Sequence, residues 1–117
     1  RLLAEEGIEV DVINARFAAP LDESRLIDIL RGSAKGIITV EDHSVACGFG
    51  SAVLETVAAA LTKGISKPIA ILGGAKNFIK HNSRDTQLMQ CGVNADNIAN
   101  TAKQMLNKLK SRKRSKR

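Results

Sequence analysis

The sequence predicts a three-layer α/β/α fold with a mostly parallel (mixed) sheet, and three observations support this class. Short apolar runs typical of strands alternate with amphipathic stretches of helix length. The hydrophobic fraction is 44%, yet the chain has three Phe and no Trp or Tyr, so small aliphatic side chains must fill the core. A length of 117 residues suits one domain, in which we expect parallel strands joined by right-handed crossovers.

The first 17 residues predict the end of a helix followed by a strand. Residues 1–7 read as the last turns of a helix, which Gly7 ends in the left-handed conformation. Because a typical helix has about three turns, we expect the start of this one, and an element before it, to be missing from the chain. In residues 8–17, apolar side chains alternate with Glu9 and Asp11, which predicts a strand.

The rest of the chain predicts alternating helices and strands. Asp22 and Asn94 are placed to cap two of the helices, Gly32 ends the first, and Lys63 with Gly64 ends the second. The expected elements are helices over 23–31, 49–64, 84–91 and 95–110, and strands over 36–41 and 67–74. The expected buried faces of the helices are Leu26, Ile27 and Leu30, then Val53, Val57 and Leu61, and finally Ile98, Ala102, Met105, Leu106 and Leu109.

The net charge of +6 comes from one end of the chain. Residues 108–117 hold seven of the 18 basic side chains and no acid, which leaves 11 basic and 12 acidic side chains in residues 1–107. A nucleic-acid groove would need a basic face, usually with stacking aromatic residues, and neither is evident in this nearly neutral body. We expect residues 108–117 to form a disordered, solvated tail, although RNA or an acidic membrane surface could bind it.

The two cysteines and the hydropathy exclude several classes of protein. Cys47 and Cys91 are too few for a disulfide framework and too far apart for a CxxC motif, so we expect buried thiols in a reducing compartment. No apolar run is long enough to span a bilayer, and no segment resembles a signal peptide.

A glycine-rich turn between a predicted strand and a predicted helix is the first candidate site. The amides of Gly48, Gly50 and Ser51 would lie at a helix N-terminus, which attracts phosphate. The dinucleotide-binding fingerprint would need a glycine where Val53 stands, and the lysine of a P-loop is absent. We therefore favour a tight turn with close helix–sheet packing over anion binding.

A polar cluster ends the strand that precedes this turn. Glu41, Asp42 and His43 lie where open α/β sheets bind ligands, at the carboxyl end of a parallel strand. Asp42 and His43 are adjacent and should point to opposite faces of an extended strand. Because no nucleophile or metal-ligand spacing accompanies them, we expect a structural or interface role.

Three further residues are candidates for interface or anion contacts. His81 and Arg84 lie in an irregular segment and could together hold a phosphate. We favour the alternative that Arg84 and Asp85 begin and cap a helix while His81 contacts a neighbouring domain. Arg16 could bind a carboxylate of a partner through its planar guanidinium, or could be exposed to solvent.

Four segments occur in an order and spacing that resembles the C-terminal domain of the 1-deoxy-D-xylulose-5-phosphate synthases, a transketolase-like family. They are NARFAAPLDESRL, ITVEDHSVACGFGSAVLE, ILGGAKNFIKHNSR and CGVNADNI. The resemblance covers residues 1–107 and makes them one domain. The C-terminal domains of a 2-oxoacid dehydrogenase β subunit and of transketolase share this architecture and stay as alternatives. The His81/Arg84 stretch and Gly92-Val93-Asn94 favour the synthase.

The resemblance implies a function without active-site residues in this chain. Enzymes of this family condense pyruvate with glyceraldehyde 3-phosphate, release carbon dioxide, and serve isoprenoid and thiamine biosynthesis. Their thiamine diphosphate and magnesium lie between the first two domains, so the resemblance implies no catalytic, cofactor or metal residue here. It implies a structural and dimerisation domain that is inactive alone, with other domains of the same chain as partners, in the bacterial cytoplasm or the plastid stroma. A small phosphate-binding regulatory module stays as an alternative.

Overall fold

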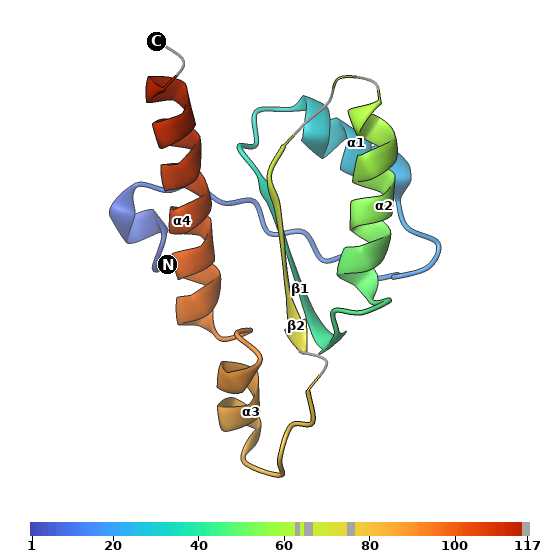
Figure 1. The fold of residues 1–117 in the computed structure, drawn as a ribbon, viewed down its shortest axis with the longest axis vertical. Helices are drawn as coiled ribbons and strands as arrows, with labels where there is room; N and C mark the ends of the chain where they lie inside the picture. Colours follow the sequence, from blue (N-terminus) through green and yellow to red (C-terminus); the bar gives the residue numbers. More distant parts are fainter. Residues whose placement is uncertain (63, 65–66, 75–76, 116–117) are drawn as a thin grey trace.

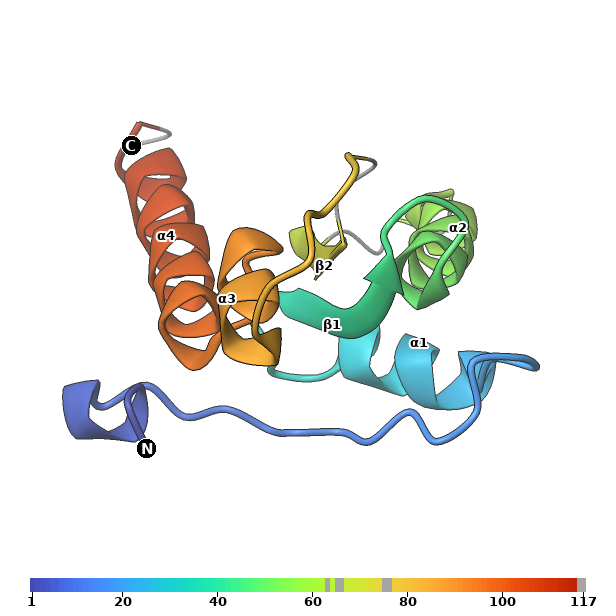
Figure 2. The same cartoon turned by 90° about the horizontal axis from the view of Figure 1, so that it is seen from below.

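A computed structural model of the chain describes residues 1–62, 64, 67–74 and 77–115. It contains two parallel strands, β1 (Ile37–Ser44) and β2 (Ile69–Gly74), which are connected through helix α2 (Phe49–Leu61). Figures 1 and 2 both show the strand pair between α2 on one side and helix α4 (Ala95–Arg114) on the other. Helices therefore cover both sides of the parallel pair, and the α/β class is confirmed.

Helix α1 (Glu23–Arg31) begins where the sequence predicted, at a carboxylate cap. The Asp22 Oδ1 atom accepts a hydrogen bond from the Arg25 backbone N–H at 3.0 Å. A second hydrogen bond to the same oxygen comes from the Ser24 hydroxyl at 2.8 Å. The cap satisfies amides that have no partner within the helix, and Gly32 follows its last turn.

The core lies where α1 packs against α2. Leu30 is 1% exposed and Val53 is 2% exposed, and Leu26 and Val57 are also buried. The predicted stripe of α2 is wrong at its last position, because Leu61 is 49% exposed and Ala60 is buried instead. With 3.6 residues per turn, a spacing of four residues drifts away from the core side over two turns.

At the far end of the chain, α3 (Arg84–Gln90) and α4 confirm two predicted helices. The Asn94 side chain caps α4 by accepting a hydrogen bond from the Asn97 N–H at 3.2 Å. The predicted apolar face of α4 is half-buried, and Ala99 is its buried residue. In the described part of the chain, no helix is long and apolar enough to span a bilayer.

Helix α4 is longer than predicted at its C-terminal end. It continues to Arg114, so residues 108–114 are helical rather than disordered, which corrects the predicted tail. Lysine and arginine have good helix propensity and favourable interactions with the C-terminal end of a helix dipole, and no Gly or Pro interrupts this stretch. Residues 116 and 117 lie outside the described residues.

The N-terminal segment differs most from its prediction. A single 3-10 turn, η1 (Ala4–Glu6), replaces the expected α-helix end, although Gly7 does end it with φ 69°. Residues 8–17 form no strand, and Val12 is 92% exposed. A strand needs a neighbour for its backbone hydrogen bonds, and within the described residues the recorded pairing joins only β1 and β2. The sequence does alternate here, but segment 8–17 pairs with no other strand among the residues that the structure describes, so the predicted strand is wrong.

Two long-range contacts of lysine side chains connect distant segments. Lys67, just before β2, donates from Nζ to the carbonyl oxygens of Ile29 at 3.2 Å and Gly32 at 2.6 Å. The ammonium thus satisfies carbonyls at the end of α1 and lies near the negative end of its dipole. Lys103 of α4 pairs with Glu6 and so holds η1 against that helix. Lys63, predicted to close α2, lies outside the described residues.

We expect the core substitution Leu30→Ala to lower the free energy of unfolding by about 2–5 kcal/mol, because it removes a side chain that is 1% exposed. Urea denaturation followed by circular dichroism measures this change. Leu54→Ala is the matched control, since Leu54 is 48% exposed and its loss should cost within about 0.5 kcal/mol. Equal losses for the two variants would contradict the assignment of the core.

The cap of α1 should make stability depend on pH. Hydrogen bonds from the Arg25 N–H and the Ser24 hydroxyl lower the pKa of Asp22 below its ordinary value of 3.8. A lowered folded-state pKa means that the stabilisation is complete above the ordinary value and is lost as pH falls through the lowered value. The difference in Tm between wild type and Asp22→Ala should therefore be largest at neutral pH and should vanish in acid. Glu9→Ala, in the unpaired segment, should show no such difference at any pH.

Candidate functional site

The carboxyl end of β1 is irregular, and this irregularity directs its polar side chains. Val40 pairs with Leu72, and the next pairing joins Ser44 to Gly74, so β1 advances four residues while β2 advances two. A bulge of this kind breaks the alternation of faces. Glu41 is buried, whereas Asp42 and His43 are both exposed, and the expectation that these two point to opposite faces stays a prediction.

Glu41 turns its side chain to the start of α2. Its Oε2 accepts a hydrogen bond from the Phe49 N–H at 2.7 Å, and its Oε1 accepts one from the Gly50 N–H at 3.0 Å. The residue before the helix, Gly48, has no side chain that could act as the cap. A carboxylate from the neighbouring strand therefore satisfies the first amides of α2 and lies at the positive end of the helix dipole.

Glycines allow this carboxylate to approach. A Cβ atom on Gly48 would lie 2.1 Å from Glu41 Oε2, and one on Gly50 would lie 2.4 Å from Ile71 Cγ2. On the opposite strand, a Cβ on Gly73 would lie 2.8 Å from Glu41 Cγ. Contacts under 3.0 Å are too close for a side chain, so close helix–sheet packing is the role that the geometry gives to these glycines.

The turn between β1 and α2 is held by hydroxyl groups. The Ser51 hydroxyl donates to the Val45 carbonyl oxygen at 2.8 Å, and the Ser44 hydroxyl accepts from the Ala46 N–H at 3.3 Å. Cys47 has φ 60° and is exposed, so the expectation of a buried thiol is wrong there. Cys91 is half-buried, and both thiols are free.

Asp42 links the strand end to α3. Arg84, the first residue of α3, donates to Asp42 Oδ2 at 2.6 Å, and both side chains are well exposed. This hydrogen bond, together with the charge of Asp42, raises the pKa of the Arg84 guanidinium. Ser83, and not Asp85, caps α3 by accepting from the Thr86 N–H at 3.3 Å. His43 Nδ1 lies 3.1 Å from the Ser44 carbonyl oxygen.

Two of the residues that the sequence singled out are not brought into this cluster. Arg16 is exposed with φ 41°, and its backbone N–H donates to Asn14 Oδ1 at 3.0 Å. His81 is exposed in the segment before α3. In the part of the chain that the structure describes, neither side chain takes part in a recorded hydrogen bond or ion pair.

Sequence reasoning missed Thr39, which is 5% exposed and lies on the same face of β1 as Glu41. Its hydroxyl has no hydrogen-bond partner among the described residues. The signal was available, because a polar residue two positions before Glu41 in an apolar strand shares its face.

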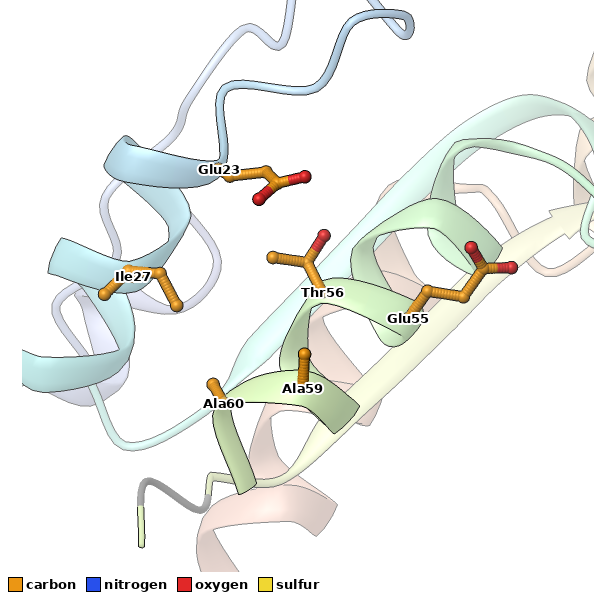
Figure 3. A pocket seen from close by; sticks show the side chains of 6 residues that line it. All are labelled: Glu23, Ile27, Glu55, Thr56, Ala59 and Ala60. Atoms are coloured by element: carbon orange, nitrogen blue, oxygen red, sulfur yellow. The ribbon is translucent and has the colours of Figure 1, made fainter. Parts of the chain in front are cut away.

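A separate shallow groove lies between α1 and α2 (Figure 3). Its lining comprises Glu23, Ile27, Glu55, Thr56, Ala59 and Ala60. Figure 3 shows the carboxylates of Glu23 and Glu55 on their own helices with Thr56 between them, and the two alanines further along α2. The lining includes no cation or nucleophilic thiol, so we assign it no chemistry.

A metal site built from side chains needs several carboxylate, imidazole or thiolate ligands close together. No group of three or more His, Cys, Asp or Glu side chains gathers within the described ranges. The buried carboxylate of Glu41 already accepts from two backbone amides.

We expect Glu41→Gln to destabilise the chain by about 1.5–3 kcal/mol, because a neutral amide replaces a charged acceptor of two hydrogen bonds. Its NH2 group would also face one of the helix amides. Denaturant unfolding measures the loss, and the neighbouring exposed Asp42→Asn is the control, for which a clearly smaller change is expected. If the two variants lose the same stability, the carboxylate does not cap α2.

Comparison with known proteins covers most of the chain, up to the first turn of α4. The family model described as "Transketolase, C-terminal domain" matches residues 1–98. The chain is 46% identical over 98 residues to a 1-deoxy-D-xylulose-5-phosphate synthase of Thermomicrobium roseum, covering 84% of this chain and 15% of that protein. It is 41% identical over 104 residues to the synthase of Aquifex aeolicus, covering 89% of this chain and 16% of that protein. On the family match, the chain belongs to the transketolase C-terminal domain family.

Proposed function

We propose that this chain is the C-terminal, non-catalytic domain of a 1-deoxy-D-xylulose-5-phosphate synthase. The observation that carries the proposal is the similarity to proteins of that name, of which the chain spans 15–16% of the length. On this proposal, the whole enzyme is a transferase that condenses pyruvate with glyceraldehyde 3-phosphate and releases carbon dioxide. It would use thiamine diphosphate and magnesium held by its other domains.

The polar side chains of Glu41 and Asp42 contact groups of the same domain, which supports a structural role for them. At the strand end where open α/β sheets bind ligands, the buried carboxylate of Glu41 is committed to capping α2. Asp42 is paired with Arg84. A general acid, base or nucleophile needs a group that is free to reach a substrate, and these groups already have partners within the domain.

Exposed apolar side chains support contacts with other parts of the same enzyme. Phe78 is 93% exposed, Val12 is 92% exposed and Phe17 is 70% exposed. Large apolar surface of this kind marks interaction sites in folded proteins. We propose that these side chains are covered by neighbouring domains of the full-length chain, and that the domain contributes to a homodimer. Val12 and Phe17 both belong to the unpaired segment 8–17.

Calorimetry tests the non-catalytic role directly. Titration of the chain with thiamine diphosphate and magnesium should give no binding heat, and pyruvate with glyceraldehyde 3-phosphate should give no carbon dioxide, because no described cluster can hold the metal. A full-length synthase under the same conditions is the positive control. Cofactor binding by this chain alone would overturn the proposal.

A further inference from the structure

The first turn of α2 is arranged as an anion site. The Phe49 and Gly50 amides point at one carboxylate, with N–H to oxygen distances of 2.7 and 3.0 Å, and Glu41 supplies that carboxylate from β1. The helix has 13 residues, so its dipole adds to the attraction.

A buried hydroxyl group, that of Thr39, lies close to these amides. The Thr39 hydroxyl belongs to a residue that is 5% exposed, and it has no partner among the described residues. A Cβ atom added to Gly50 would lie 2.8 Å from Thr39 Oγ1 and 3.0 Å from Glu41 Oε1, so the hydroxyl and the carboxylate both lie next to Gly50. A buried hydroxyl without a partner is costly and is uncommon in native structures.

We propose that the N-terminus of α2 is a carboxylate-binding site that the chain fills with its own Glu41 side chain. Removal of that side chain leaves a site for a free carboxylate of the size of acetate. In the wild-type chain the site is closed to added anions, including phosphate, because the covalently attached carboxylate of Glu41 already occupies both amides. The inference does not rest on the proposed function, since it concerns only contacts within the domain.

The side-chain atoms that Glu41→Ala removes indicate which free carboxylate should fit the vacated site. Glu41→Ala deletes Cγ, Cδ and the two carboxylate oxygens, and acetate has these same four heavy atoms in the same connection. A planar carboxylate can place one oxygen on each amide, as Glu41 does. Tetrahedral phosphate is bulkier and would have to fit beside Gly48 and Gly50, where a single added Cβ atom would already lie 2.1 and 3.0 Å from the Glu41 oxygens. Acetate should therefore bind more tightly than phosphate.

The surrounding charges favour a ligand that is held by amides rather than by cations. The polar groups beside the carboxylate include the Phe49 and Gly50 amides, the Thr39 hydroxyl and, next to Gly48, the Ser44 carbonyl oxygen. The nearest acid along β1, Asp42, is exposed and paired with Arg84. With Glu41 absent, Thr39 can become the third donor to a bound carboxylate.

Thermal unfolding of the full 117-residue chain tests the proposal, with sodium acetate titrated against sodium chloride at equal ionic strength and constant pH. The Tm of Glu41→Ala should rise with acetate along a saturating curve and should respond more weakly to phosphate. Wild type and the neighbouring Asp42→Ala should show no saturating response to either anion. A Tm of Glu41→Ala that follows acetate and chloride equally would overturn the proposal, as would a saturating response of the wild type to phosphate.

A second measurement separates specific binding from general stabilisation. In the Thr39→Val/Glu41→Ala double variant, acetate should bind several-fold more weakly, because one donor is lost. Acetate should shift the amide resonances of Phe49 and Gly50 in Glu41→Ala, and not in Glu41→Gln, whose amide fills the space. If Glu41→Ala is unfolded in buffer, acetate and not chloride should restore its helical circular dichroism. Absence of that recovery, or unchanged amide resonances in a folded variant, would also overturn the proposal.

Discussion

The hydrogen bonds between the Glu41 carboxylate and the first amides of α2 stabilise the carboxyl end of β1, the turn that follows it and the start of α2. They join β1 to α2, and they fix the turn between them, since Gly48 cannot cap the helix itself. Burying a charge is costly unless strong hydrogen bonds compensate for its lost hydration. Here two backbone donors and a helix dipole provide that compensation, and the bulge in β1 directs the carboxylate to them.

The contacts of Glu41 and Asp42 connect secondary-structure elements within the domain, although both residues lie where a ligand site would be expected. Polar residues at the carboxyl end of a parallel strand usually face a bound molecule. In this domain, Glu41 faces backbone amides and Asp42 faces Arg84, so the polar groups connect β1 with α2 and α3. Several large apolar side chains of this domain, Phe78 and Val12 among them, are by contrast exposed.

Two helix caps, which depend on contacts over only a few residues, were predicted correctly from the sequence. Asp22 and Asn94 cap the helices that they were expected to cap, because an N-cap bonds amides only two or three residues away. Features that depend on distant partners were missed. The alternation in residues 8–17 predicts a strand, yet pairing requires a neighbour that local pattern cannot supply. The partners of Glu41, the amides of Phe49 and Gly50, depend on how β1 and α2 pack together, which no short motif encodes.

The two hydrogen bonds of Lys67 have a consequence for the order in which the domain is assembled. They close a loop of 35 residues between Gly32 and Lys67, which contains β1 and all of α2. Closing so long a loop has an entropic cost that forming α1 alone cannot offset. The last turn of α1 therefore gains its ammonium partner only after the crossover has brought β2 into place. Its carbonyls should open and close together with the strand pair, as one cooperative unit, although α1 precedes both strands in the chain.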